Sequence, residues 1–178
     1  MTDTTFTVHR SPVGEILLAV TDEGLVSAHV LGGDGDDSDL PVQLARLARA
    51  LGTFPGREDE AAAPARRQLD EYFAGTRREF DLRLDWRLVR GFARDALQAA
   101  CDVPYGQTAG YGEVAAMAGR ERAARAVGNA CAHSPFSIVV PVHRVVRADG
   151  SIGGYGGRAE IKRFLLEHER EHQRAAGE

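Results

Sequence analysis

The chain has 178 residues, of which 43% are hydrophobic and 27% charged, and its net charge is −4. This length suits one domain or two small ones, and the composition excludes a disordered or fibrous chain. No apolar run approaches the ~18 residues of a membrane helix, the N-terminus lacks the features of a secretion signal, and two cysteines do not indicate a disulfide scaffold, so we expect a cytoplasmic protein that binds no membrane.

The first half of the chain predicts a small α/β unit built on an antiparallel sheet. Residues 5–20 alternate apolar and polar side chains around a Pro-Val-Gly turn, which is typical of a β-hairpin. Further strands are expected at 25–31 and 80–84, helices at 40–51 and 64–75, and loops at 32–39 and 54–63. We therefore take residues 1–85 as the first domain.

The second half, residues 86–178, differs in charge and in pattern. Residues 1–85 hold 9 basic and 16 acidic side chains, a balance of −7, whereas residues 86–178 hold 13 basic and 10 acidic ones, a balance of +3. Helices are expected at 88–100, 113–118, 122–131 and 160–172. The mild basic excess favours DNA as a partner only slightly.

The two short helices at 113–118 and 122–131, joined through Gly119, form a helix-turn-helix pattern. The second of them is almost bare of large side chains, and Arg122 and Arg125 stand out from it. Long cations on a slim helix suit a groove of DNA. The alternative is that its small residues serve close helix–helix packing.

Residues 137–157 carry the most distinctive pattern in the chain. An apolar run at 138–140 predicts a short buried strand that Pro141 ends, so that His143 and Arg144 are held on a turn. Gly153 to Gly157 then surround Tyr155 with four residues that have no side chain. Such a loop can pass very close to a ligand.

This segment resembles the active site of the O6-alkylguanine-DNA alkyltransferases, the methylated-DNA–protein-cysteine methyltransferases. Their signature is Pro-Cys-His-Arg-Val followed by a Gly-rich loop with an aromatic residue. Pro141, His143, Arg144 and the loop match it, but Val142 stands where the family carries its nucleophilic cysteine. The resemblance implies an α/β (α+β) fold with an N-terminal ribonuclease-like domain and a C-terminal helical domain that contains a winged helix-turn-helix.

The resemblance also implies roles for individual residues. Residues 123–130 look like the family's recognition helix, in which Arg125 would fill the gap in the base stack and Tyr111 would rotate the damaged nucleotide out. His143 and Glu169 match the family's general base and its orienting carboxylate. Ser134 stands where the family has an asparagine that ties the turn near the cysteine. The residues expected to bind DNA or the lesion are Tyr111, Arg122, Arg125, Ala126, Gly128, Val142, Arg144, Tyr155 and Gly156.

Valine cannot accept an alkyl group, because it has no lone pair and no proton to lose. The sequence therefore predicts a damage-recognition protein that flips O6-alkylguanine out of duplex DNA without alkyl transfer, as the alkyltransferase-like proteins do, and passes the lesion to nucleotide excision repair. His143 and Glu169 would then be remnants of the relay. We expect a monomer with double-stranded DNA as its partner and with no cofactor or metal, although His168 and His172 are spaced one helical turn apart.

Two other interpretations stay open from the sequence. The chain is an enzyme if Cys131, which ends the recognition helix near His133, has become the nucleophile, or if the protein is an engineered cysteine-to-valine variant of an active methyltransferase. The bland interpretation of Cys131, and of Cys101, is a small apolar side chain packed in the core. A binding module with a regulatory role is the third interpretation, against which Tyr111, Arg125 and Tyr155 argue.

Overall fold

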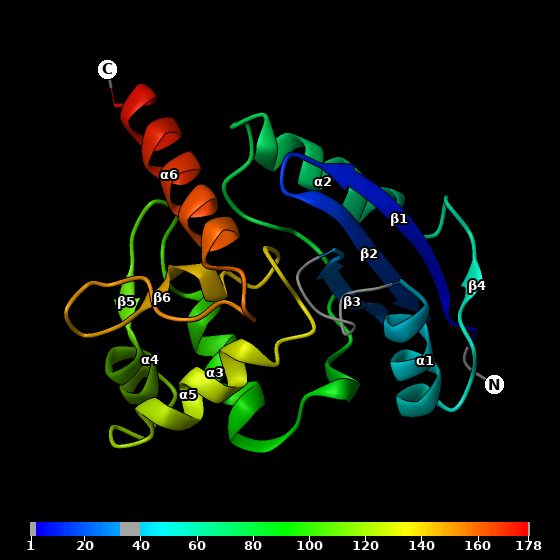
Figure 1. Cartoon of the computed structure of the whole chain (residues 1–178), viewed down its shortest axis with the longest axis horizontal. Helices are drawn as coiled ribbons and strands as arrows, with labels where there is room; N and C mark the ends of the chain where they lie inside the picture. The colour runs from blue at the N-terminus through cyan, green and yellow to red at the C-terminus, as the bar shows by residue number, and fades with distance from the viewer. Residues whose placement is uncertain (1–2, 33–39, 178) are drawn as a thin grey trace. The chain divides into compact units, whose positions relative to one another are not determined.

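The computed structural model describes residues 3–32 and 40–177 and forms two compact units, residues 1–88 and 89–178 (Figure 1). The fold is mixed α+β, which confirms the predicted class. The strands are β1 (Thr5–Ser11), β2 (Gly14–Thr21), β3 (Gly24–Val30), β4 (Gly56–Arg57), β5 (Ala109–Gly110) and β6 (Val145–Val146). The α-helices are α1 (Leu40–Leu51), α2 (Ala63–Phe73), α3 (Gly91–Cys101), α4 (Tyr111–Met117), α5 (Ala124–Ala132) and α6 (Ala159–Ala175), and the short 3-10 helices are η2 (Trp86–Leu88) and η3 (Val142–Arg144).

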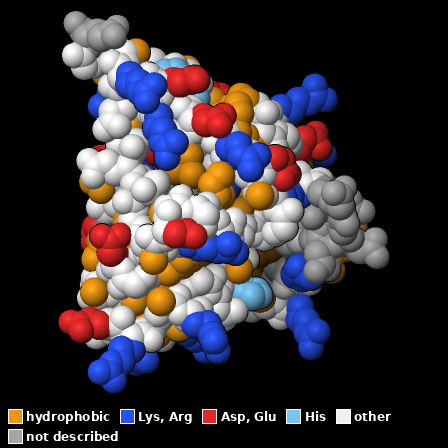
Figure 2. Space-filling model, turned by 60° about the vertical axis from the view of Figure 1, so that its left-hand side comes forward, with side chains coloured by type: hydrophobic (Ala, Val, Ile, Leu, Met, Phe, Trp, Pro, Cys, Tyr) orange, Lys and Arg blue, Asp and Glu red, His pale blue; other side chains and the backbone are white. Residues whose placement is uncertain are grey.

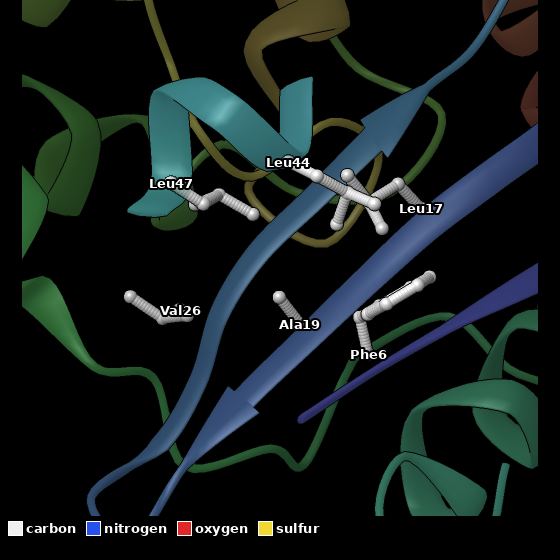
Figure 3. Packing of buried hydrophobic residues seen from close by; sticks show 6 residues of the cluster. All are labelled: Phe6, Leu17, Ala19, Val26, Leu44 and Leu47. Carbon is white, nitrogen blue, oxygen red and sulfur yellow. The ribbon is translucent and has the colours of Figure 1, made fainter. Parts of the chain in front are cut away.

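The first unit is organised by a four-stranded sheet in the order β3-β2-β1-β4. Strands β1, β2 and β3 are antiparallel neighbours, and the register pairs Phe6 with Ala19. Side chains from the three strands meet Leu44 and Leu47 of α1 in one apolar cluster (Figure 3). Burial of this cluster stabilises the contact between the helix and the sheet.

The opposite face of the sheet is covered as well. Residues 16–19 of β2 are all fully buried, which requires cover on both faces because side chains alternate along a strand. Nε2 of His9 on β1 lies 2.7 Å from Oδ1 of Asp70 on α2, so α2 packs on this second face. The sheet is therefore the middle layer of the unit.

The second unit is mainly helical. Helices α3, α4 and α5 pack against one another, and α6 packs on η3. Strands β5 and β6 form a parallel pair, Ala109 with Val145 and Gly110 with Val146, that fixes the start of α4 beside the end of η3. Within residues 3–32 and 40–177, no helix combines the length and the apolarity needed to span a membrane.

The predicted hairpin, third strand and helices are confirmed, with ends shifted by a few residues. The predicted strand at 80–84 is wrong. There the chain makes one isolated bridge, Leu25 to Leu84, and the backbone N–H and C=O of Asp81 both bond the side-chain amide of buried Gln68, at 2.8 Å each. A side chain thus takes the place of a neighbouring strand.

The structure differs from one of the two predicted loops of the first unit. The loop expected at 54–63 contains β4, which pairs in parallel with the start of β1. A two-residue strand carries no period that the sequence could reveal. Most of the loop expected at 32–39 lies outside the described residues.

Candidate functional site

The turn that carries the site residues is buried throughout. Residues 138–140 are not the predicted strand: Ile138 has a φ of +70°, and the backbone N–H of Val140 donates to the carbonyl of Phe136 at 3.2 Å. The chain therefore turns back on itself before Pro141, and η3 follows, closed by a bond from the N–H of Arg144 to the carbonyl of Pro141 at 3.0 Å. Val142, His143 and Arg144 all lie in the interior.

Glu169 of α6 is the hub to which this turn is tied. Its Oε1 lies 2.6 Å from Nε2 of His143 and 3.0 Å from Nη2 of Arg144, and its Oε2 accepts from Nε of Arg144 at 2.9 Å. The backbone N–H of Gly106 also donates to Oε2, at 3.0 Å. The structure thus brings together His143 and Glu169, the pair that the sequence analysis assigned to the relay.

The electrostatics of this cluster fix its protonation. Burial alone would raise the pKa of Glu169, but hydrogen bonds from His143 and Arg144 and their charges outweigh it and hold the pKa well below its usual range. Burial is also the main cause that lowers the pKa of His143, against the opposing effect of Glu169. The pair at neutral pH is a carboxylate with Arg144 as its counter-ion and a neutral imidazole.

A neutral imidazole bonded in this way has one free lone pair. Because a carboxylate only accepts, Nε2 of His143 carries the ring hydrogen and Nδ1 is left as an acceptor. Nδ1 is buried and has no hydrogen-bond partner among the described residues. This is the form that a general base requires, yet the preceding side chain, that of Val142, offers it no proton.

Arg144 lies in the interior, although the sequence analysis placed it among the residues that contact DNA or the lesion. Its side chain is about 8% exposed, it bonds Glu169, and its Nη1 donates to the carbonyl of Val103 at 2.7 Å. The guanidinium also lies 5.6 Å from the centre of the Tyr105 ring. These contacts hold the segment before β5 against η3 and α6.

The other expected DNA contacts lie on α5 or just before it. Arg125 and Ala126 are exposed on α5, and Arg122 is exposed in the turn that precedes the helix. Gly128 is half-buried, and a Cβ built there would meet the Tyr111 ring at 3.7 Å. On the face drawn in Figure 2, Lys and Arg side chains are dispersed among apolar ones.

Tyr111 is the first residue of α4, not a residue ahead of a helix that begins at Glu113 as predicted. Glu113 caps this helix start through its Oε2, which accepts from the N–H of Gly110 at 2.5 Å. Burial raises the pKa of Tyr111, with a further contribution from Cys131. The phenol is therefore neutral over the physiological range.

The Gly-rich loop places Tyr155 with its hydroxyl buried and Gly156 at the surface. Burial raises the pKa of Tyr155, while Ile138 and Ser137 act in the opposite direction. The hydroxyl thus points toward the turn before Pro141. Gly153, Gly156 and Gly157 all have positive φ, which residues with a side chain rarely adopt.

Both cysteine thiols have pKa values above the ordinary one. Burial raises the pKa of Cys131 to about 11, and the nearby charge of Lys162 only partly opposes this. His133, which the sequence suggested as an activating neighbour, has its Nδ1 2.9 Å from the carbonyl of Asn129 instead. Cys101 is exposed at the end of α3, so the expected core position is wrong for this residue. Partial burial of the thiol, with a contribution from Asp102, raises the pKa of Cys101 to about 11, and its Sγ donates to the carbonyl of Leu97 at 3.4 Å.

Other kinds of site are sparse in the described part of the chain. It contains no group of three or more His, Cys, Asp and Glu side chains that could hold a metal ion. Cavities of about 600 Å³ and 510 Å³ lie in the first and second units, and none of the predicted DNA- or lesion-binding residues lines either of them.

The sequence analysis missed Lys162. Its side chain is buried, and Nζ donates to the carbonyl of Val145 at 2.5 Å, directly after η3. A signal was available, because this is the single lysine of the chain.

The second unit combines the buried His–Glu pair with two short helices, α4 and α5, that pack against each other. Residues 5–86 match the family described as 6-O-methylguanine DNA methyltransferase, ribonuclease-like domain, and residues 91–171 match its DNA binding domain. The chain belongs to the methylated-DNA–protein-cysteine methyltransferase family.

Curated relatives and solved structures support the same family assignment. The methylated-DNA–protein-cysteine methyltransferase of Mycobacterium tuberculosis H37Rv is 44% identical over 160 residues, which cover 90% of this chain and 88% of the relative. That of Methanosarcina barkeri is 36% identical over 95% of this chain and 99% of the relative. The crystal structure of the M. tuberculosis O6-methylguanine methyltransferase has a TM-score of 0.79 at 36% identity, covering 95% of this chain and 94% of that one, and a structure of M. tuberculosis OGT in complex with DNA has a TM-score of 0.77 at 35% identity, covering 96% and 94%.

Proposed function

We propose that this protein recognises O6-alkylguanine in duplex DNA by nucleotide flipping, holds it without alkyl transfer, and serves DNA repair. The observation that carries the proposal is that Val142 occupies the position between Pro141 and His143 while the surrounding apparatus is kept. His143 and Glu169 are bonded at 2.6 Å in the interior, yet the adjacent side chain has no atom that could accept an alkyl group.

DNA binding is supported by the family and by the exposed face of α5. A relative of the same fold has been crystallised with DNA. Arg125 and Ala126 are exposed, and the small side chains of α5 allow a close approach of the backbone to a groove. In the proposal, Tyr111 rotates the damaged nucleotide and Arg125 fills the gap in the stack.

The absence of transfer is supported by the two thiols that remain. A thiolate is the reactive form of cysteine, and a pKa of about 11 leaves on the order of one thiol in ten thousand ionised at pH 7. The lesion would therefore be bound rather than repaired in one step. Release to nucleotide excision repair proteins, by a monomer, completes the proposal.

A second candidate is an active methyltransferase that uses Cys131. It is favoured by one observation, the cation of Lys162 near the thiol, which lowers the pKa of Cys131. Burial has the larger and opposite effect. An engineered cysteine-to-valine origin of Val142 would leave the binding proposal unchanged.

Intact-protein mass spectrometry tests these candidates. The wild-type protein and the Cys131→Ser and Val142→Cys variants are incubated with a duplex that carries one O6-methylguanine, and binding is followed by anisotropy beside the undamaged duplex. We expect lesion-selective binding with no mass change for the wild type, and the gain of one methyl group for Val142→Cys only. A methyl group on wild-type Cys131 would establish the enzyme, and equal affinity for both duplexes would refute lesion recognition.

The flipping apparatus is tested by Arg125→Ala with Arg170→Ala as its control. Both residues are exposed arginines of the second unit, on α5 and α6 respectively. Loss of a side chain that contacts the flipped-out site costs about 1–3 kcal/mol, roughly 5- to 150-fold in affinity. The control should bind the lesion duplex with nearly the affinity of the wild type. Equal losses of affinity in both variants would mean that Arg125 acts only through the net charge of the protein.

A further inference from the structure

Lys162 is chemically singular in this chain. The sequence contains 22 basic residues, of which 21 are arginine, and the one lysine is 1% exposed. A buried ammonium is unfavourable unless its hydrogens are bonded, and lysine differs from arginine in being a compact, rotatable donor.

The ammonium of Lys162 joins three segments of the candidate site. It donates to the carbonyl of Val145 in β6 at 2.5 Å and to the carbonyl of Gly154 in the Gly-rich loop at 3.4 Å. It also lies 5.7 Å from the centre of the Tyr111 ring at the start of α4. This distance is within the range of a cation–π interaction, which strengthens when the cation is desolvated.

Tyr111 lies in a slot that two glycines leave open. A Cβ built at Gly153 would lie 3.0 Å from the Tyr111 hydroxyl oxygen, and one built at Gly128 would lie 3.7 Å from its ring. The Gly-rich loop and α5 therefore bound the ring on different sides, and Lys162 contacts it as well. The position of the ring depends on where Lys162 holds the loop.

We infer that Lys162 is a positioning residue of the lesion site, whose ammonium holds Tyr111 and the Gly-rich loop in the arrangement that accepts a flipped alkylguanine. This inference rests on the proposed function and extends it to a buried residue of α6 that contacts the helix-turn-helix only through the ring of Tyr111 in the contacts described. It predicts that lesion recognition, and not general DNA binding, depends on the charge at this position.

The charge of Lys162 is also adjustable by pH. Burial lowers the pKa of Lys162 to about 8, with Cys131 and Arg147 as its charged or titratable neighbours. Cys131 and Tyr111 have raised pKa values, and arginine keeps its proton. Lys162 is thus the member of this group that titrates near pH 8, and lesion selectivity should weaken as the pH rises through that value.

Because the chain has a single lysine, its side chain can be observed directly. Full-length protein labelled with 13C at the lysine Cε gives one side-chain NMR signal, which is titrated free, with an undamaged duplex, and with the same duplex carrying O6-methylguanine. We expect the lesion duplex to raise the midpoint above the value with undamaged duplex, by roughly one pH unit for each tenfold preference of the lesion for the ammonium form. Equal midpoints with the two duplexes would overturn the inference.

The paired variants are Lys162→Met and, as control, Arg163→Met. Each removes one positive charge from α6, but Arg163 is exposed. We expect Lys162→Met to lose roughly tenfold or more in lesion selectivity, to keep its affinity for undamaged duplex, and to show no pH dependence between 7 and 9, while Arg163→Met behaves as the wild type.

The outcomes separate the two proposals. Selectivity in Lys162→Met equal to that of the wild type overturns the role of Lys162 and leaves the proposed function intact. A wild-type protein that does not distinguish the duplexes overturns the proposed function itself. If Lys162→Met fails to fold, the NMR titration of Lys162 in the wild-type protein decides whether this residue has the inferred role.

Discussion

Replacing Glu169 by glutamine tests whether the buried hub holds the second unit together. The substitution keeps the shape of the side chain but replaces one carboxylate oxygen with an NH₂ group. Glu169 is fully buried and accepts from His143, from Arg144 and from the N–H of Gly106. A glutamine leaves part of these donors facing another donor, and it leaves the guanidinium of Arg144 without its counter-ion.

This arrangement predicts a large loss of stability in Glu169→Gln. Breaking a buried ion pair by removing one partner costs about 3–5 kcal/mol, because the remaining charge is uncompensated. Whole domains are stable by about 5–15 kcal/mol, so the variant should lose a large share of the stability of its second unit. Adding Arg144→Met to Glu169→Gln should recover part of the loss, since the stranded charge is then absent.

Urea unfolding with two probes makes the measurement specific. Trp86 is the one tryptophan and lies in the first unit, so its fluorescence reports on residues 1–88, whereas far-UV circular dichroism includes the helical second unit. We expect a shifted circular-dichroism transition for Glu169→Gln, and a change within about 0.5 kcal/mol for the control Glu171→Gln, which is exposed on the same helix. A loss below about 1 kcal/mol in Glu169→Gln would refute the view that the cluster is structural.

Three further predictions concern the same site. Val142→Cys should gain alkyl transfer, measured as one methyl group at that residue, because the free Nδ1 of His143 can take up the thiol proton; no transfer would mean that the turn holds the side chain out of reach. The folded pKa values of His143 and of its carboxylate partner both lie below their unfolded values, so the contribution of this pair to the stability of the second unit should be complete above about pH 6.5. This contribution should fall as the pH drops below that value, as circular dichroism in a pH series would show. Gly153→Ala should reduce both stability and lesion binding, because the added Cβ would lie 3.0 Å from the Tyr111 hydroxyl oxygen. The control Gly150→Ala introduces similar φ strain, but its Cβ would meet nothing within 4 Å, so it should reduce stability alone.

The segments whose side chains follow a regular period were predictable from the sequence. The hairpin of β1 and β2 and the helices carry periods of two or of three to four residues, and these periods report directly on burial of one face. The family was predictable too, because Pro141, His143, Arg144 and the Gly-rich loop are contiguous or nearly so. Val142 was visible for the same reason.

The period of apolar side chains does not predict the structure of a segment that is buried on every side or whose backbone bonds a side chain. Residues 138–140 would be apolar in a buried strand, and they are equally apolar in the buried turn that they form. The amino-acid sequence does not reveal that Ile138 has a φ of +70°. Residues 80–84 alternate like a strand, but Gln68 from α2 takes up the backbone groups of Asp81.

What the sequence determined by itself was therefore local: the period of each element, the motif around Pro141, and the valine at position 142 of that motif. Tertiary structure decided which distant groups meet. Gly106 and Glu169 are 63 residues apart and share a hydrogen bond. Lys162 contacts Val145, Gly154 and Tyr111, which belong to three different segments. A side chain's charge and its contacts depend on what surrounds it after folding, so the interior position of Arg144 and the contacts of Lys162 became visible only in the folded chain.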